Sequence, residues 1–73
     1  MKGVNMNITI NGEVISLERD GITILALLKE RKVTKPEMVS VQLNGAFVGG
    51  EDLDATVLKE NDALDYLYFM SGG

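Results

Sequence analysis

One dipeptide, Asn-Gly, occurs twice in this 73-residue chain and constrains its fold more than any other feature. Both residues of the pair tolerate a positive φ, so the pair favours the type I′ turn of a two-residue β-hairpin. The first copy, Asn11-Gly12, separates residues 6–10 from residues 13–17. Both runs alternate apolar and polar side chains, as half-buried strands do. The sequence therefore predicts a hairpin at its start.

The second copy, Asn44-Gly45, predicts another hairpin. Residues 38–43 before it alternate, and the short run 46–48 after it is apolar. Pro36, the only proline, lies just ahead of this hairpin. Its missing N–H and fixed φ are expected to exclude helix nearby. This part of the chain is therefore expected to be strand.

Between the hairpins, residues 24–32 are good helix formers. Thr23 precedes them, and its hydroxyl can accept a hydrogen bond from an N–H of the first turn, so we expect it to be the N-cap. Ile24, Leu27 and Leu28 are spaced to form one apolar stripe. The sequence therefore predicts one amphipathic helix.

The last predicted strand, residues 63–70, is apolar on both faces near its end. Alternation places on one face Leu64, Tyr66, Tyr68 and Met70. It places on the other face Asp65, Leu67 and Phe69. A central strand buried on both sides would show the same pattern. One helix covers only one face of so small a sheet, so we expect an exposed, partner-docking patch of Leu67 and Phe69 with Met70 beside it.

The order of these elements predicts an α+β domain with one main helix on a mixed sheet of four to five strands. Residues 49–54 are expected to form a loop, residues 56–58 an irregular or 3₁₀ turn, and Asn61 a positive φ. We expect the last strand to lie beside and parallel to the first, in the middle of the sheet. This is the β-grasp arrangement. The domain is predicted at 6–70, after an N-terminal extension at 1–5 and before a tail at 71–73.

Composition excludes several classes of function. The chain has no Cys and no His, so it has no disulfide, no Cys/His zinc site, and neither a catalytic thiol nor a Ser-His-Asp triad. A formal net charge of −4 disfavours nucleic-acid binding. No apolar run approaches the length of a membrane span, so we expect no membrane partner and a cytoplasmic location. We also expect a monomer when the protein is free.

The acidic residues of the second half do not form a recognisable metal or catalytic motif. They are Glu51, Asp52, Asp54, Glu60, Asp62 and Asp65. The run from Glu51 lacks the central glycine of a calcium loop. A chain this small can hardly build the cleft of a two-carboxylate hydrolase. We therefore expect no metal and no catalytic side chain.

The remaining candidate is the end of the sequence, Ser71-Gly72-Gly73. The simplest interpretation is a frayed tail. However, glycine has no Cβ, so a diglycine is slim enough to enter a narrow active-site channel. Residues 70–73 reach about 13 Å when fully extended. The tail therefore suits a domain whose reactive group is the carboxylate of Gly73.

A compact β-grasp domain that ends in a diglycine resembles the ubiquitin-like sulfur carriers, and most of all the ThiS carriers of thiamine biosynthesis. The shared landmarks are the first hairpin from residue 6, Thr23-Ile24 with Leu27-Leu28, residues 41–45, Asn61-Asp62, and the terminal Gly72-Gly73. The diglycine is the specific landmark. The chain departs from the common family pattern at Gly49-Gly50, Leu53 and Asn61.

The resemblance implies a mechanism in which the Gly73 carboxylate is adenylated and then converted to a thiocarboxylate. An adenylating enzyme of the ubiquitin-activating type would use MgATP, and the carrier itself would hold no permanent cofactor. A cysteine desulfurase or rhodanese would supply sulfur. A thiazole synthase would receive it. The protein would thus be a cosubstrate and not an enzyme.

Four alternatives stay open at this point. The same tail chemistry occurs in the small subunit of molybdopterin synthase, which is MoaD-like, and in carriers for amino-acid or tRNA thiolation. A ubiquitin-like protein modifier would instead join Gly73 to a lysine. The last alternative is an interaction domain whose diglycine has no role. Prolines often precede the tail of MoaD-like carriers, and residues 68–71 contain none, which favours the ThiS type.

Overall fold

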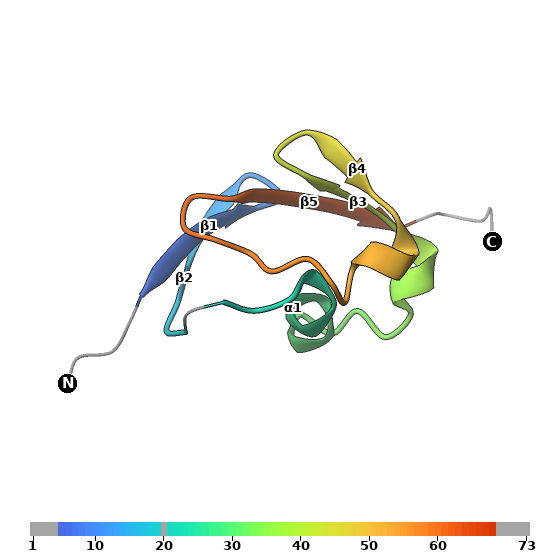
Figure 1. Ribbon diagram of the computed structural model, residues 1–73, viewed down its shortest axis with the longest axis horizontal. Helices are drawn as coiled ribbons and strands as arrows, with labels where there is room; N and C mark the ends of the chain where they lie inside the picture. Colours follow the sequence, from blue (N-terminus) through green and yellow to red (C-terminus); the bar gives the residue numbers. More distant parts are fainter. Residues whose placement is uncertain (1–4, 20, 69–73) are drawn as a thin grey trace.

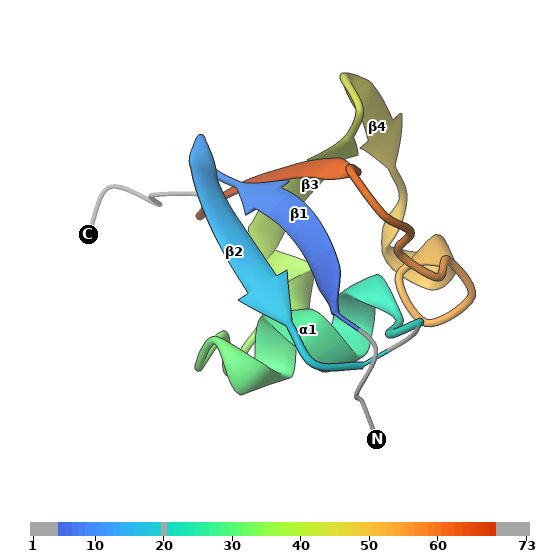
Figure 2. The ribbon, with the colours of Figure 1, turned by 90° about the vertical axis from the view of Figure 1, so that its left-hand side faces the viewer.

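The computed structural model describes residues 5–19 and 21–68. They form a five-stranded mixed sheet in the order β2-β1-β5-β3-β4, with one α-helix against one face (Figures 1 and 2). The elements are β1 (Met6–Ile10), β2 (Glu13–Leu17), α1 (Ile24–Glu30), η1 (Pro36–Met38), β3 (Val39–Leu43), β4 (Ala46–Val48), η2 (Gly50–Asp52) and β5 (Ala63–Tyr68). The predicted α+β class and β-grasp arrangement are confirmed.

The last strand lies in the middle of the sheet, as predicted. β5 pairs parallel with β1, where Ile10 is the register partner of Leu64, and antiparallel with β3 on its other side. Leu64 is completely buried and Ile10 is 1% exposed. The first and last strands of the chain therefore meet at the centre of the core.

Both Asn-Gly turns form with the backbone that this dipeptide favours. Asn11 and Gly12 have φ of 51° and 85°, and Asn44 and Gly45 have φ of 53° and 87°. Positive φ at both central residues is the requirement of a type I′ hairpin turn. Asn61 also has the positive φ expected of it, at 70°.

Helix α1 has the predicted cap at its start but ends earlier than predicted. The Thr23 hydroxyl accepts a hydrogen bond from the Ala26 N–H at 3.1 Å. At the other end Lys32 takes a φ of 69°, and the Val33 N–H bonds to the Leu28 carbonyl at 2.9 Å. This six-to-one bond after a left-handed residue is a Schellman cap, and Val33 is the buried apolar residue that often follows such a cap. The cap stops the helix at Glu30, two residues short of the predicted end.

Three predictions about the connecting segments are wrong. Pro36 does not exclude helix but begins η1, because the first helical position needs no N–H and suits the fixed φ of proline. The predicted loop after β4 contains the 3₁₀ helix η2. The expected turn at 56–58 is extended instead, and Val57 forms a bridge with Thr23. Leu53 and Leu58 are both buried, and these anchors draw the segment against the start of α1.

A buried carboxylate fixes the start of β5. Asp62 is 7% exposed. One of its oxygens accepts a hydrogen bond from Asn44 Nδ2 at 3.0 Å, and the other accepts one from the Lys59 N–H at 2.7 Å. Asp62 therefore ties the β3–β4 turn to the turn that precedes β5.

We expect the Asp62→Ala variant to have a free energy of unfolding lowered by about 1–3 kcal/mol, because two donors lose their acceptor in a poorly hydrated place. Denaturant titration followed by circular dichroism measures this change. Asp65→Ala is the matched control, because Asp65 is exposed and should shift the free energy by no more than about 0.5 kcal/mol. Equal effects of the two substitutions would contradict the structural role of Asp62.

Candidate functional site

The candidate site is the face of the sheet opposite α1, called here the outer face (Figures 1 and 2). On β5 the outer face carries Asp65 and Leu67, whose register partners on β3 are Gln42 and Ser40. Leu67 is 74% exposed, whereas Leu64 on the inner face is buried. The prediction that Leu67 is exposed is confirmed.

The sequence analysis missed Phe47, which is 69% exposed. Phe47 on β4 is the register partner of Gln42, and Gln42 is the partner of Asp65. These side chains therefore lie in one row across the outer face. The position of the second Asn-Gly turn already contains this information, because a two-residue hairpin pairs residue 42 with residue 47 and puts both on one face.

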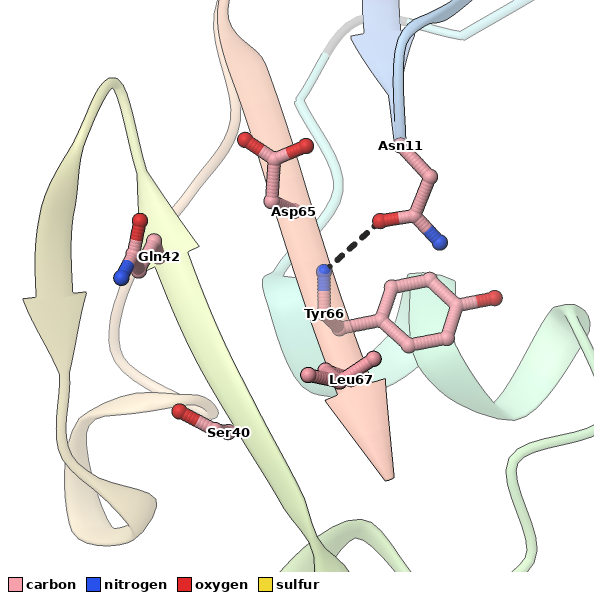
Figure 3. Close-up of a pocket in the computed structure, with 6 residues that line it drawn as sticks. All are labelled: Asn11, Ser40, Gln42, Asp65, Tyr66 and Leu67. Carbon is pink, nitrogen blue, oxygen red and sulfur yellow. Dashed lines mark hydrogen bonds between the residues drawn. The ribbon is translucent and has the colours of Figure 1, made fainter. Parts of the chain in front are cut away.

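A shallow hollow of about 470 Å³ follows β5 on this face (Figure 3). Its lining residues are Asn11, Ser40, Gln42, Asp65, Tyr66 and Leu67. Sites for small molecules enclose most of their ligand. This hollow is open and combines polar groups with one exposed leucine, so its shape suits contact with another protein surface.

The strand beside the hollow is held at Tyr66. The Tyr66 N–H donates to Asn11 Oδ1 at 2.9 Å (Figure 3), and the Tyr66 hydroxyl accepts from Arg31 Nε at 3.3 Å. The first contact comes from the β1–β2 turn and the second from the end of α1. Two separate elements thus fix β5 just before Leu67.

Two of the acidic residues, Asp62 and Glu60, have structural partners. Besides the two bonds of Asp62, Glu60 Oε1 accepts a hydrogen bond from the Asn7 N–H at 3.0 Å. Among residues 5–19 and 21–68, no group of three His, Cys, Asp or Glu side chains lies close enough to hold a metal ion. No helix in the same part of the chain is long and apolar enough to cross a membrane.

The other candidate residues follow β5 in the sequence. Phe69, Met70, Ser71, Gly72 and Gly73 lie outside the described residues, so their roles stay predictions. Tyr68, the last described residue, is 43% exposed.

Comparison with protein families gives a match to the ThiS family over residues 5–73. The chain belongs to the ThiS family. The match spans nearly the whole chain and confirms the resemblance drawn from the sequence. Membership of the ThiS family supports the broad role of a small sulfur carrier in thiamine biosynthesis.

Solved structures agree with this assignment. The crystal structure of the thiamine biosynthesis protein ThiS from Geobacter metallireducens is 40% identical, with a TM-score of 0.81, and the match covers 93% of this chain and 100% of that one. The solution structure of a thiamine biosynthesis protein from the same organism is also 40% identical, with a TM-score of 0.79 and coverage of 93% and 88%. A comparison with curated protein sequences gives no match.

The two leucines of β5 should differ sharply in their contribution to stability. We expect the Leu64→Ala variant to have a free energy of unfolding lowered by about 2–5 kcal/mol, because it leaves a cavity in the core. Leu67→Ala should change this free energy by no more than about 0.5 kcal/mol, since the side chain is exposed. Denaturant titration of both variants measures the difference. A large loss for Leu67→Ala would mean that Leu67 belongs to the core and not to a docking surface.

Proposed function

We propose that this protein is a ThiS-type sulfur carrier that acts through the carboxylate of Gly73. The family match supports this, because it extends over residues 5–73 and so includes the diglycine. The described residues supply a rigid domain, and Gly73 lies five residues beyond Tyr68 in the sequence. The proposed reactive group belongs to the backbone, so the absence of cysteine and histidine from the chain is no obstacle.

The first proposed step is adenylation of the Gly73 carboxylate. A carboxylate is a poor electrophile, so an adenylating enzyme of the ubiquitin-activating type joins a carboxylate oxygen to the α-phosphorus of MgATP and releases pyrophosphate. The product is a mixed anhydride with AMP as its leaving group. Activation of this kind divides one difficult substitution into two easier steps.

The second proposed step transfers sulfur. The terminal sulfur of a persulfide on a cysteine desulfurase or rhodanese attacks the Gly73 carbonyl carbon, and the bond to AMP breaks. A thiol then reduces the resulting acyl disulfide and releases the thiocarboxylate. Thiazole synthase accepts this sulfur for the thiazole ring of thiamine. All catalytic groups in the scheme belong to the partners.

The outer face is the proposed docking surface for these enzymes. Leu67 and Phe47 expose most of their apolar area there, and Phe69 and Met70 extend the predicted patch along the sequence. Burial of one exposed leucine or phenylalanine side chain contributes about 1.5–3 kcal/mol to association. The position of Leu67, six residues before Gly73, places the contact next to the reactive tail.

Intact-mass spectrometry tests the proposed chemistry. Incubation with a ThiS-pathway adenylating enzyme, MgATP, a persulfide donor and a thiol should replace one oxygen of the carrier by sulfur. Deletion of Gly73 should abolish the mass change, because the reacting carboxylate then stands one residue too early. The folded state of the truncated protein is checked by circular dichroism.

Three other results would change the functional assignment of the protein. No mass change with any adenylating enzyme of this type would contradict the carrier role. Conjugates of higher mass in a cell lysate would indicate a protein modifier. Sulfur delivery to molybdopterin and not to thiazole in a reconstituted assay would assign the carrier to the MoaD type.

Leu67→Asp tests the docking surface. The substitution should raise the KM for the carrier in the adenylation reaction by about 10- to 100-fold, because it removes buried apolar area and adds a charge to the interface. Val57→Asp is the matched control. Val57 is 50% exposed but lies near Met6, at the opposite end of the sheet from Leu67. A KM raised equally by both substitutions would contradict a docking surface centred on Leu67.

A further inference from the structure

The asparagines of the two hairpin turns make the same kind of contact with the central strand. Asn44 Oδ1 accepts a hydrogen bond from the Ala63 N–H at 2.9 Å, at the start of β5. Asn11 Oδ1 accepts one from the Tyr66 N–H, also at 2.9 Å, nearer the end of β5. A type I′ turn requires only a positive φ, so these side-chain contacts are additional to the turn.

The contact of Asn11 occurs where β5 loses its neighbour on one side. The last register pair between β1 and β5 is Ile10 with Leu64, and the Asn11 N–H then donates to the Leu64 carbonyl at 2.9 Å. β3 continues along the other side of β5 as far as Tyr68. Among the described residues, no strand pairs with β5 on the β1 side beyond Leu64. The Asn11 side-chain oxygen therefore accepts the hydrogen bond from the Tyr66 N–H that a backbone carbonyl would accept if β1 were longer (Figure 3).

We propose that Asn11 is a positioning residue for the carrier reaction, because its side-chain oxygen sets the direction in which β5 continues toward Gly73. This role rests on the proposed function. Tyr66 is held by Asn11 at its backbone and by Arg31 at its hydroxyl. Loss of the Asn11 oxygen leaves the Tyr66 N–H without its partner and frees β5 to move away from the hairpin.

A small change in the direction of β5 at Tyr66 produces a large displacement of the Gly73 carboxylate. The five residues from Phe69 to Gly73 span at most roughly 17 Å when extended in an enzyme channel. A rotation of about 4° at the base of such a segment displaces its end by about 1 Å, and a misplacement of that size can slow a reaction about 100-fold. Leu67 precedes this segment and stays paired with Ser40 on β3, so the docking surface moves less than the tail. Loss of Asn11 should thus affect kcat more than KM.

Two matched glycine substitutions test this role. Asn11→Gly and Asn44→Gly both keep the positive φ of the turn, since glycine adopts it freely, and both remove an oxygen that holds β5. Pyrophosphate exchange catalysed by an adenylating enzyme, at varied carrier concentration, gives kcat and KM. We expect Asn11→Gly to lower kcat about tenfold and to change KM by no more than about twofold. Asn44→Gly should leave both within about twofold, although it also removes a hydrogen bond to Asp62.

A conservative substitution and an exchange measurement complete the test. Asn11→Asp keeps a side-chain oxygen and tolerates positive φ, so it should restore most of kcat. Amide hydrogen exchange in the free protein should be at least about tenfold faster at Tyr66 in Asn11→Gly than in the wild type, and unchanged there in Asn44→Gly.

The possible results are distinguishable. An unchanged kcat in Asn11→Gly, or an equal loss in Asn44→Gly, would overturn the positioning role and leave the proposed function intact. Unchanged exchange at Tyr66 would overturn it as well, because the side chain would then not hold the strand. A wild-type carrier that no adenylating enzyme activates would overturn the proposed function, and the positioning role with it.

Discussion

The parallel pairing of β1 with β5 is the contact on which the rest of the structure depends. It joins the first strand to the last, and it is short, with the Thr9 N–H bonded to the Asp62 carbonyl and the Asn11 N–H bonded to the Leu64 carbonyl, both at 2.9 Å. Parallel neighbours need a long crossover connection, and here that connection contains the only α-helix of the described residues. The helix covers one face of the sheet. Because the connection between β1 and β5 supplies this one helix, the described residues leave the other face of the sheet, the outer face, uncovered.

The same pairing separates a buried part of β5 from an exposed part. Leu64 lies between β1 and β3 and is completely buried, whereas Tyr68, on the same face but past the end of β1, is 43% exposed. The strand thus leaves the core within a few residues while β3 still supports it. The proposed carrier reaction needs this combination, because the domain would have to stay folded while the end of the chain reacts in the active site of another protein.

Local features of the sequence were sufficient to predict most of the fold, because each depends on one residue and its neighbours. The Asn-Gly pairs predicted both turns, and Thr23 predicted the start of the helix. The alternation of apolar and polar residues predicted that Leu64 and Leu67 lie on opposite faces of the sheet. The errors arose where distant contacts decide the backbone. The burial of Val33 ends α1 through a cap that has lysine in place of glycine, and buried Leu53 and Leu58 hold an extended segment where a turn was expected. Phe47 was overlooked because its face follows from the pairing across a turn and not from its own short strand.

The contact of Asn11 with β5 is a feature that the sequence alone does not predict. The turn already accounts for an asparagine at this position, so the sequence gives no reason to look for a further contact. Asparagine and glycine both adopt a positive φ in such turns, but only asparagine carries a side-chain oxygen that reaches a neighbouring N–H. The Tyr66 N–H is in reach because β1 ends at Ile10, opposite Leu64 and two residues before Tyr66, and that offset exists only once the two strands are paired. A residue that the turn requires thereby also becomes the last support of β5 on its β1 side, while β3 supports the other side as far as Tyr68.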